Sequence, residues 1–241
     1  YKRQVEDGAQ IISISQGTGY LGTAAKWAIA NAIAHGVIIV ASAGNASDNE
    51  NTTHLGRYSG VVGVSAINTD GTFASYSSWG NGVVTAAVGG PFNTLDENTN
   101  QPTTVQGTSM STALVAGMLA LARQKWPDAT TNQILQSLVH TGLNPNHEWN
   151  QYTGYGAIDG GGLVIDDPSQ YPEENPLLEK GSRFAFHRDD LYDYYYGLAN
   201  PREVLNDDWY VYRGVDEESA LSEGHGYEVH LGTSPLYHYQ G

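Results

Sequence analysis

The chain has 241 residues, enough for one large domain or for one domain with an appendage. Its 26 acidic residues outnumber its 11 basic ones and give a net charge of −15, which argues against binding to the phosphate backbone of nucleic acid. Cysteine is absent, which excludes a disulfide framework and a cysteine nucleophile, and no stretch reaches the roughly 18 consecutive apolar residues of a membrane span. We therefore expect neither nucleic acid nor a membrane among the partners.

Two short apolar runs flank a helical pattern near the N-terminus. Residues 11–15 and 37–40 are rich in β-branched side chains without polar alternation, as in strands that are covered on both faces. Between them, residues 24–35 space their apolar side chains as in a helix, which Gly36 ends. The order strand, helix, strand predicts a parallel βαβ unit and hence an α/β fold.

The loop after the first predicted strand carries a formal dinucleotide fingerprint. Residues 17–22 read Gly-Thr-Gly-Tyr-Leu-Gly, which fits the pattern that binds pyrophosphate at a helix N-terminus. That pattern also needs an acidic residue about 20 positions further on, to hold the ribose hydroxyls. The chain has Ala41-Ser42-Ala43-Gly44 there. We therefore favour a loop beside a substrate groove and keep dinucleotide binding as an alternative.

Asn45 follows the second predicted strand, at the edge of the sheet where α/β proteins place their ligands. A carboxamide at this edge can donate a hydrogen bond to an oxyanion. The competing interpretation is an Asx turn, which an isolated asparagine after glycine commonly forms. A further strand is predicted over residues 61–66, and a further amphipathic helix over residues 128–139.

The most apolar helical pattern begins at Ser109. Residues 114–122 are apolar on nearly every face, so we expect a central helix that is buried on all sides. Ser109 lies at its start, where unpaired backbone N–H groups and the helix dipole favour negative charge. The serine could be a plain helix cap or a nucleophile. It is not the nucleophile elbow of the α/β-hydrolases, because Ser111 stands where G-x-S-x-G requires glycine.

The composition changes after Asp166. Residues 167–182 are rich in acid and proline and are predicted to form a linker. Residues 183–241 are crowded with tyrosine, and residues 208–212 and 227–231 alternate like half-buried strands. The predicted division is a domain over residues 1–166, the linker, and a small β-rich appendage. A packing face on its tyrosines is favoured over carbohydrate or protein binding.

Three segments resemble the subtilisin-like serine proteases, the subtilases, in the family's own order. Residues 107–117 resemble the nucleophile segment, residues 9–17 the strand that pairs with substrate, and residues 40–45 the segment that ends in the oxyanion asparagine. The resemblance covers roughly residues 5–165, and residues 83–91 look like the strand and turn that the family places before its loop to the nucleophile. It implies a three-layer fold with a mainly parallel central sheet and a central helix that starts at Ser109. The sequence Gly160-Gly161-Gly162 departs from the family and should weaken its terminal helix.

The resemblance also implies roles. Ser109 is the expected nucleophile, and Asn45 and the Ser109 N–H are the expected oxyanion donors, with Thr108 assisting. Ser15, Gln16 and Gly17 are expected along the substrate backbone, and Ala43 and Gly44 in the first specificity pocket. The implied reaction is the hydrolysis of peptide bonds by a secreted enzyme. No cofactor is required, and calcium, common in the family as a structural ion, has no site that we can assign.

The family's triad runs Asp, His, Ser along the chain, and both partners lie well before the oxyanion asparagine. Only 44 residues precede Asn45 here, and neither Asp7 nor His35 fits the family's segments. The chain starts at Tyr1 without a leader, so we expect a processed or truncated product. The aspartate and histidine are expected on an upstream segment, and the chain alone should be nearly inactive. A catalytically inactive fragment or binding module is the alternative.

Overall fold

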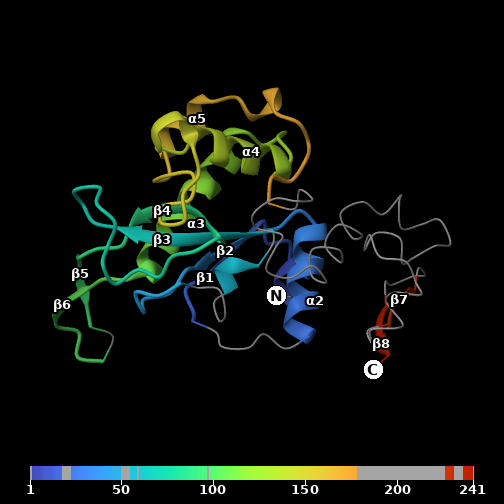
Figure 1. The fold of residues 1–241 in the computed structure, drawn as a ribbon, viewed down its shortest axis with the longest axis horizontal. Helices are drawn as coiled ribbons and strands as arrows, with labels where there is room; N and C mark the ends of the chain where they lie inside the picture. Colours follow the sequence, from blue (N-terminus) through green and yellow to red (C-terminus); the bar gives the residue numbers. More distant parts are fainter. Residues whose placement is uncertain are drawn as a thin grey trace.

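The computed structural model describes residues 2–17, 23–49, 55–58, 60–96 and 98–177, together with the backbone of residues 226–230 and 236–240. Its centre is a four-stranded sheet in the order β1-β2-β3-β4, with every neighbouring pair parallel (Figure 1). The strands are β1 (Ile11–Ile14), β2 (Ile38–Ser42), β3 (Val61–Ile67) and β4 (Val83–Val88). Helix α2 (Thr23–Ala34) links β1 to β2, which confirms the predicted βαβ unit.

The two middle strands are buried along their whole length. Alternate side chains of a strand point to opposite faces of its sheet. On one face, Val40, Val62 and Val64 belong to a core cluster that includes Val115 and Leu119 of helix α3 (Thr108–Lys125). Helix α2 packs against β2 on the other face. The sequence predicted helices on both faces of the sheet from apolar runs without polar alternation. The three-layer α/β fold is confirmed.

Helix α3 is buried on one side only. Val115, Leu119 and Ala122 lie fully inside, whereas Leu114 and Leu121 on the opposite side expose 38% and 57% of their surface. The expectation of burial on every face is therefore not met in the described part of the chain. The helix is apolar all round, as the sequence indicated, but only the sheet and its neighbours α4 and α5 cover it here. None of the described helices, α3 included, combines the length and apolarity that crossing a membrane requires.

Two helices follow α3 and pack beside it. Helix α4 (Thr131–Thr141) replaces the helix predicted over residues 128–139, because Thr130 and Gln133 form a capping box that fixes its start. Helix α5 (Gly160–Ile165) forms in spite of its three glycines. Leu163 is buried, and its carbonyl accepts a hydrogen bond of 3.0 Å from the Trp126 indole, so tertiary contacts offset the low helix propensity.

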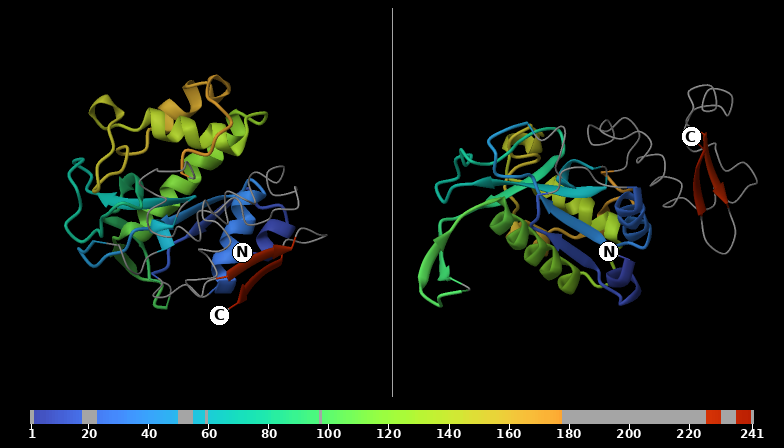
Figure 2. Two further views of the ribbon diagram at one scale, coloured as in Figure 1. Left: turned by 45° about the vertical axis from the view of Figure 1, so that its right-hand side comes forward. Right: turned by 90° about the horizontal axis from the view of Figure 1, so that it is seen from below.

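A two-stranded hairpin, β5 (Phe92–Leu95) and β6 (Pro102–Val105), projects from the body and leads directly to α3 (Figure 2). The sequence analysis did not predict it. The remaining short elements are helix α1 (Lys2–Glu6) and the 3-10 turns η1 (Leu55–Arg57), η2 (Pro145–His147) and η3 (Pro168–Gln170).

The acidic segment after Asp166 is described as far as Leu177 and lies against α4. Side-chain amides of α4 donate to its backbone carbonyls: Gln133 to Tyr171, Asn132 to Glu173 and Gln136 to Glu174, at 2.9–3.2 Å. Leu177 ends this strap, which we define as residues 171–177, inside the core at 0% exposure. Of the predicted appendage, strands β7 (Gly226–His230) and β8 (Leu236–Gln240) pair as an antiparallel hairpin. The strand predicted over residues 208–212 lies outside the described residues.

Candidate active site

The candidate site lies where the loops after β1 and β2 meet the start of α3. Because β1 and β2 are parallel, the residues that follow them emerge at the same edge of the sheet. Ser109 is the second residue of α3, so the helix begins one residue earlier than predicted, with Gly107 at its N-cap. Three segments far apart in the sequence thus converge on Ser109, as the sequence analysis expected.

Asn45 is fixed by Thr108. Its Oδ1 accepts a hydrogen bond of 2.9 Å from the Thr108 backbone N–H and another of 2.9 Å from the Thr108 hydroxyl. Both Thr108 groups are donors, so the carboxamide oxygen must face them and the Nδ2 donor points away from these two groups. The Thr108 hydroxyl in turn accepts a 3.3 Å bond from the Gly44 N–H. Thr108 itself is fully buried, which makes it a rigid support for the asparagine.

Gly107 allows this approach. Its φ of 153° and ψ of 162° are rarely adopted by residues that carry a side chain. A Cβ at this position would lie 3.1 Å from Asn45 Nδ2, closer than an ordinary contact. The Gly107 N–H donates to the Gly89 carbonyl at 2.8 Å, and the Tyr76 hydroxyl donates to the same carbonyl at 3.0 Å. Partial burial raises the pKa of Tyr76, so this support stays protonated at neutral pH.

Ser109 and Ser15 bind each other twice. The Ser15 hydroxyl donates to the Ser109 carbonyl at 2.9 Å, and the Ser109 hydroxyl donates to the Ser15 carbonyl at 3.2 Å. Both side chains are accessible to solvent. The first bond ties the end of β1 to the first turn of α3, and the second holds the Ser109 proton on a backbone carbonyl.

The geometry can bind a negative oxygen. In the first turn of α3, Met110 bonds to the Gly107 carbonyl, whereas the Ser109 N–H has no intrahelical acceptor. Asn45 Nδ2 donates to no acceptor within the described residues. Two donors, one from a helix N-terminus and one from a carboxamide, therefore flank the residue that carries the hydroxyl, where the helix dipole also favours an anion.

The other predicted site residues have different surroundings. Gln16 and Gly17 follow Ser15 in an exposed loop. Ala43 and Gly44 are buried, and the Ala43 N–H continues the β2–β3 ladder by donating to Val64 at 2.9 Å. Positions 18–22, which complete the formal dinucleotide fingerprint, lie outside the described residues.

No base contacts Ser109 in the described part of the chain. Nδ1 of His35 is bonded to Asn31, and Nδ1 of His147 to Gly142. The His140 ring stacks on Tyr171 with 4.7 Å between the centroids. These are the histidines whose side chains the structure describes, and none of them hydrogen-bonds to Ser109.

Comparison with known proteins decides the family. The profile of the peptidase S8 family, the subtilases, matches residues 1–156, well over half of the chain. This chain belongs to the subtilase family. The match includes Ser15, Asn45 and Ser109 and ends before the strap, so every segment of the candidate site lies within it.

Individual proteins with similar sequences support the same family. The chain is 31% identical over 160 residues to the thermostable alkaline protease of Halalkalibacterium halodurans, and 32% identical over 158 residues to subtilisin DY of Bacillus licheniformis. These matches cover 66% and 64% of this chain but only 42% and 56% of the relatives, so the chain spans about half of their length. The crystal structure of fervidolysin from Fervidobacterium pennivorans superposes with a TM-score of 0.59 at 28% identity, covering 71% of this chain and 28% of that one.

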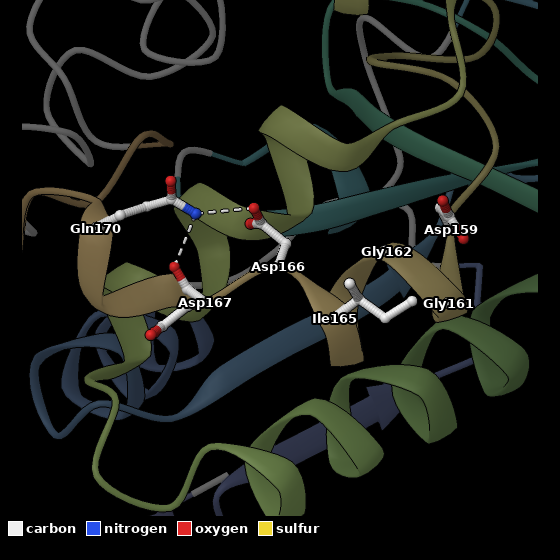
Figure 3. Close-up of a pocket in the computed structure, with 7 residues that line it drawn as sticks. All are labelled: Asp159, Gly161, Gly162, Ile165, Asp166, Asp167 and Gln170. Carbon is white, nitrogen blue, oxygen red and sulfur yellow. Dashed lines mark hydrogen bonds between the residues drawn. The ribbon is translucent and has the colours of Figure 1, made fainter.

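A separate hollow lies beside α5 and η3, on elements that hold none of the site residues. It has a volume of about 560 Å³ and is lined by three carboxylates and their neighbours, namely Asp159, Gly161, Gly162, Ile165, Asp166, Asp167 and Gln170 (Figure 3). The Gln170 amide donates to Asp166 and to the Asp167 carbonyl. Hydrogen bonds from Ser169 lower the pKa of Asp167. Within the described residues, no group of three or more His, Cys, Asp or Glu is arranged to hold a metal ion.

Two features of the site escaped sequence reasoning. The Thr108 hydroxyl links Asn45 to Gly44, and the Ser15 hydroxyl ties β1 to α3. A threonine before the serine was a weak signal, because hydroxyl residues commonly precede helices as simple caps. The exchange between Ser15 and Ser109 joins residues 94 positions apart and could not be read from either segment alone.

Proposed function

We propose that this chain supplies the nucleophile and the oxyanion hole of a serine endopeptidase. The observation that carries the proposal is the double hydrogen bond from Thr108 to Asn45, which fixes the carboxamide beside the helix that bears Ser109 and leaves its Nδ2 donor unused by these bonds. A helix cap alone would not require an asparagine from the loop after β2 to be held in this orientation. Membership of a protease family supports the same reading.

In the proposed reaction, the Ser109 oxygen attacks the carbonyl carbon of a peptide bond. The carbonyl oxygen becomes an anion that Asn45 Nδ2 and the Ser109 N–H stabilise. The Ser109 proton passes to a histidine, which returns it to the leaving amine. That histidine, with an aspartate to orient it, is proposed to come from an upstream segment, because no described histidine bonds to Ser109.

We propose that the substrate backbone pairs with residues 15–17, which are exposed after β1. The first specificity pocket is proposed to involve Ala43 and Gly44. Since only small residues have been identified there, a large apolar side chain is the proposed guest, which profiling on a peptide library would test. We further propose a secreted enzyme that needs no cofactor. Calcium remains a proposed structural ion without an assigned site.

Active-site labelling tests this function. The reading frame that contains Tyr1 should be expressed with its upstream coding sequence and treated with a fluorophosphonate, which reacts with activated serines. We expect labelling at Ser109, its loss in Ser109→Ala, and no change in Ser169→Ala, a serine in η3. The chain from Tyr1 alone should react at least about 10³-fold more slowly, because removal of the histidine in subtilisin lowers turnover by about 10⁶.

The second candidate is a catalytically inactive binding module of the same fold. It is favoured by one observation, that the Ser109 hydroxyl donates to a backbone carbonyl and not to a base. A folded precursor that does not react with the fluorophosphonate, and whose peptide binding is unchanged in Ser109→Ala, would support this candidate against the peptidase.

A further inference from the structure

Tyr76 lies in a segment that holds the loop of Asn45 in place. The Ser47 N–H donates to the Tyr76 carbonyl at 3.2 Å, and the Ser78 N–H donates to the Gly44 carbonyl at 2.8 Å. These bonds fix the backbone on both sides of Asn45, because Gly44 precedes it and Ser47 follows it by two residues. The position of the Asn45 carboxamide therefore depends on where residues 75–78 lie.

The side chain of Tyr76 reaches the other half of the candidate site. Its hydroxyl donates to the Gly89 carbonyl at 3.0 Å, and the same carbonyl accepts the Gly107 N–H at 2.8 Å. Gly107 is the N-cap of α3, two residues before Ser109. Tyr76 thus bonds to the Asn45 loop through its backbone and to the anchor of α3 through its hydroxyl.

Gly89 leaves room for this hydroxyl. A Cβ at position 89 would overlap the Tyr76 hydroxyl oxygen and would lie 2.7 Å from the Ala66 Cβ, which is much closer than an ordinary contact. The φ of Gly89 is not positive, so lack of space, and not a left-handed backbone, requires glycine here. The hydroxyl of Tyr76 is therefore part of the close packing between β3 and the residues that follow β4.

We propose that the Tyr76 hydroxyl is a positioning group of the oxyanion hole and sets the separation of its two donors, Asn45 Nδ2 and the Ser109 N–H. One donor belongs to the loop that Tyr76 holds through its backbone, and the other to the helix start that it holds through the Gly89 carbonyl. The role assigned to these donors rests on the proposed function, whereas the bonds that place them do not.

The separation of the donors matters because both must reach one oxygen. Donors of an oxyanion hole act at about 2.7–3.1 Å from the oxyanion, and a misplacement of about 1 Å in an active site can cost about 10² in rate. Phenylalanine would fill the space of the Tyr76 ring but would offer no donor to Gly89. Partial burial raises the pKa of Tyr76, so its hydroxyl keeps the proton of this bond at neutral pH.

Tyr76→Phe removes the donor and keeps the ring. In the precursor with its upstream sequence we expect kcat on a peptide substrate to fall at least about tenfold, with KM little changed, because the donors act in the transition state. Thr85→Val is the matched control, since the buried Thr85 hydroxyl also donates to a backbone carbonyl, that of Gly156 at 2.9 Å, from a strand that holds no site residue. Both variants should lower the midpoint of urea unfolding by similar amounts, but only Tyr76→Phe should lower kcat.

A second substitution separates positioning from stability alone. In Asn45→Asp the oxyanion hole has already lost one donor, so the separation of the donors no longer matters. Tyr76→Phe should therefore lower the remaining kcat by less than about twofold in that background. An equal loss with and without Asn45→Asp would show that the hydroxyl does not act through the asparagine, and would overturn the proposal.

A spectroscopic measurement tests the placement without relying on activity. In the precursor with asparagine and glycine labelled by a heavy nitrogen isotope, Tyr76→Phe should shift the NMR resonances of the Asn45 side-chain amide and the Gly107 N–H. Thr85→Val should shift neither. Resonances that Tyr76→Phe does not shift overturn the positioning role.

Activity and spectroscopy together separate this proposal from the proposed function. Shifted resonances in a precursor that neither cleaves peptides nor reacts with the fluorophosphonate support the placement by Tyr76 and overturn the peptidase. In an active precursor, a kcat that Tyr76→Phe leaves unchanged overturns the positioning role and leaves the proposed function standing.

Discussion

The carboxamide oxygen of Asn45 accepts two hydrogen bonds from Thr108, one from its backbone N–H and one from its hydroxyl, each 2.9 Å long. The bonds join residues 63 positions apart in the sequence. The amide nitrogen of Asn45 takes no part in these two bonds. It is therefore available to donate a hydrogen bond to a ligand.

This arrangement separates the acceptor of Asn45 from its donor. Asn45→Asp keeps an oxygen for Thr108 but replaces the Nδ2 donor with an acceptor. In the complete precursor we expect kcat on a peptide substrate to fall at least about 10²-fold, the loss seen in subtilisin when this donor is removed. KM should change little. Unchanged turnover would remove Asn45 from the oxyanion hole.

Gly107 offers a test of the same contact through the backbone. Gly107→Ala adds a Cβ 3.1 Å from Asn45 Nδ2 at a φ of 153°, so both the backbone and the asparagine must shift. We expect a loss of about 1–3 kcal/mol in the free energy of unfolding, measured in urea. Gly117→Ala is the control, because its Cβ would meet nothing within 4 Å and alanine favours a helix interior. That variant should gain about 0.5–1 kcal/mol.

The Ser15 hydroxyl should contribute to stability separately from substrate binding. Ser15→Ala removes the 2.9 Å bond to the Ser109 carbonyl, and we expect the free energy of unfolding to fall by about 0.5–1.5 kcal/mol. Ser15→Thr retains a hydroxyl and should recover most of that loss. If alanine and threonine behave alike, the bond between β1 and α3 contributes nothing measurable.

The strap should belong to the folded domain. Leu177 is fully buried, so Leu177→Ala should lower the free energy of unfolding by about 2–5 kcal/mol. Ile165→Ala serves as the comparison, since Ile165 is 81% exposed and its truncation should cost less than about 0.5 kcal/mol. If Leu177→Ala lowers the free energy of unfolding no more than Ile165→Ala does, the contact of the strap with the core does not contribute to stability.

Asp96, in the turn between β5 and β6, should make the free energy of unfolding depend on pH. Hydrogen bonds from Thr99 and from the Asn98 N–H lower the pKa of Asp96 below its usual 3.8. The charged carboxylate therefore stabilises the fold above about pH 3.8, and that contribution is lost as the pH falls through the lowered pKa.

Urea unfolding of Asp96→Ala between pH 2.5 and 7 measures this contribution. The unchanged chain should be more stable than the variant at neutral pH, and the two should converge on acidification. Thr99→Val keeps the carboxylate but removes one donor, so its pH dependence should lie between them. A constant difference at every pH would show that the carboxylate charge is not the source.

Sequence patterns predicted the sheet because its strands are short apolar runs bounded by glycine, a pattern typical of a parallel sheet that is covered on both faces. They also placed Ser15, Asn45 and Ser109 near one another, through the resemblance to subtilases and through the rule that parallel strands end at a common edge. The hairpin β5–β6 was missed since its strands are polar and half-exposed, with burial patterns that carry little hydrophobic signal.

The course of the acidic segment could not be read from its composition. Acid and proline predict a linker when only local sequence is considered. The segment lies on α4 because Asn132, Gln133 and Gln136 offer amide donors on one helix face to backbone carbonyls some 40 positions away, a match that no local pattern reveals. The prediction that α3 is buried on every side was not met for a related reason. An apolar sequence indicates that a helix packs against other segments on all sides, but it does not indicate which segments these are.

The burial of Leu177 also fixes the point from which the tyrosine-rich region departs. The Leu177 carbonyl accepts a hydrogen bond of 3.3 Å from the Gly60 N–H, immediately before β3 begins. Asn45 follows the carboxyl end of β2, which is parallel to β3, so it lies at the other end of the sheet. Leu177 is therefore anchored at the opposite end of the sheet from Asn45, about 23 Å away for a strand of seven residues.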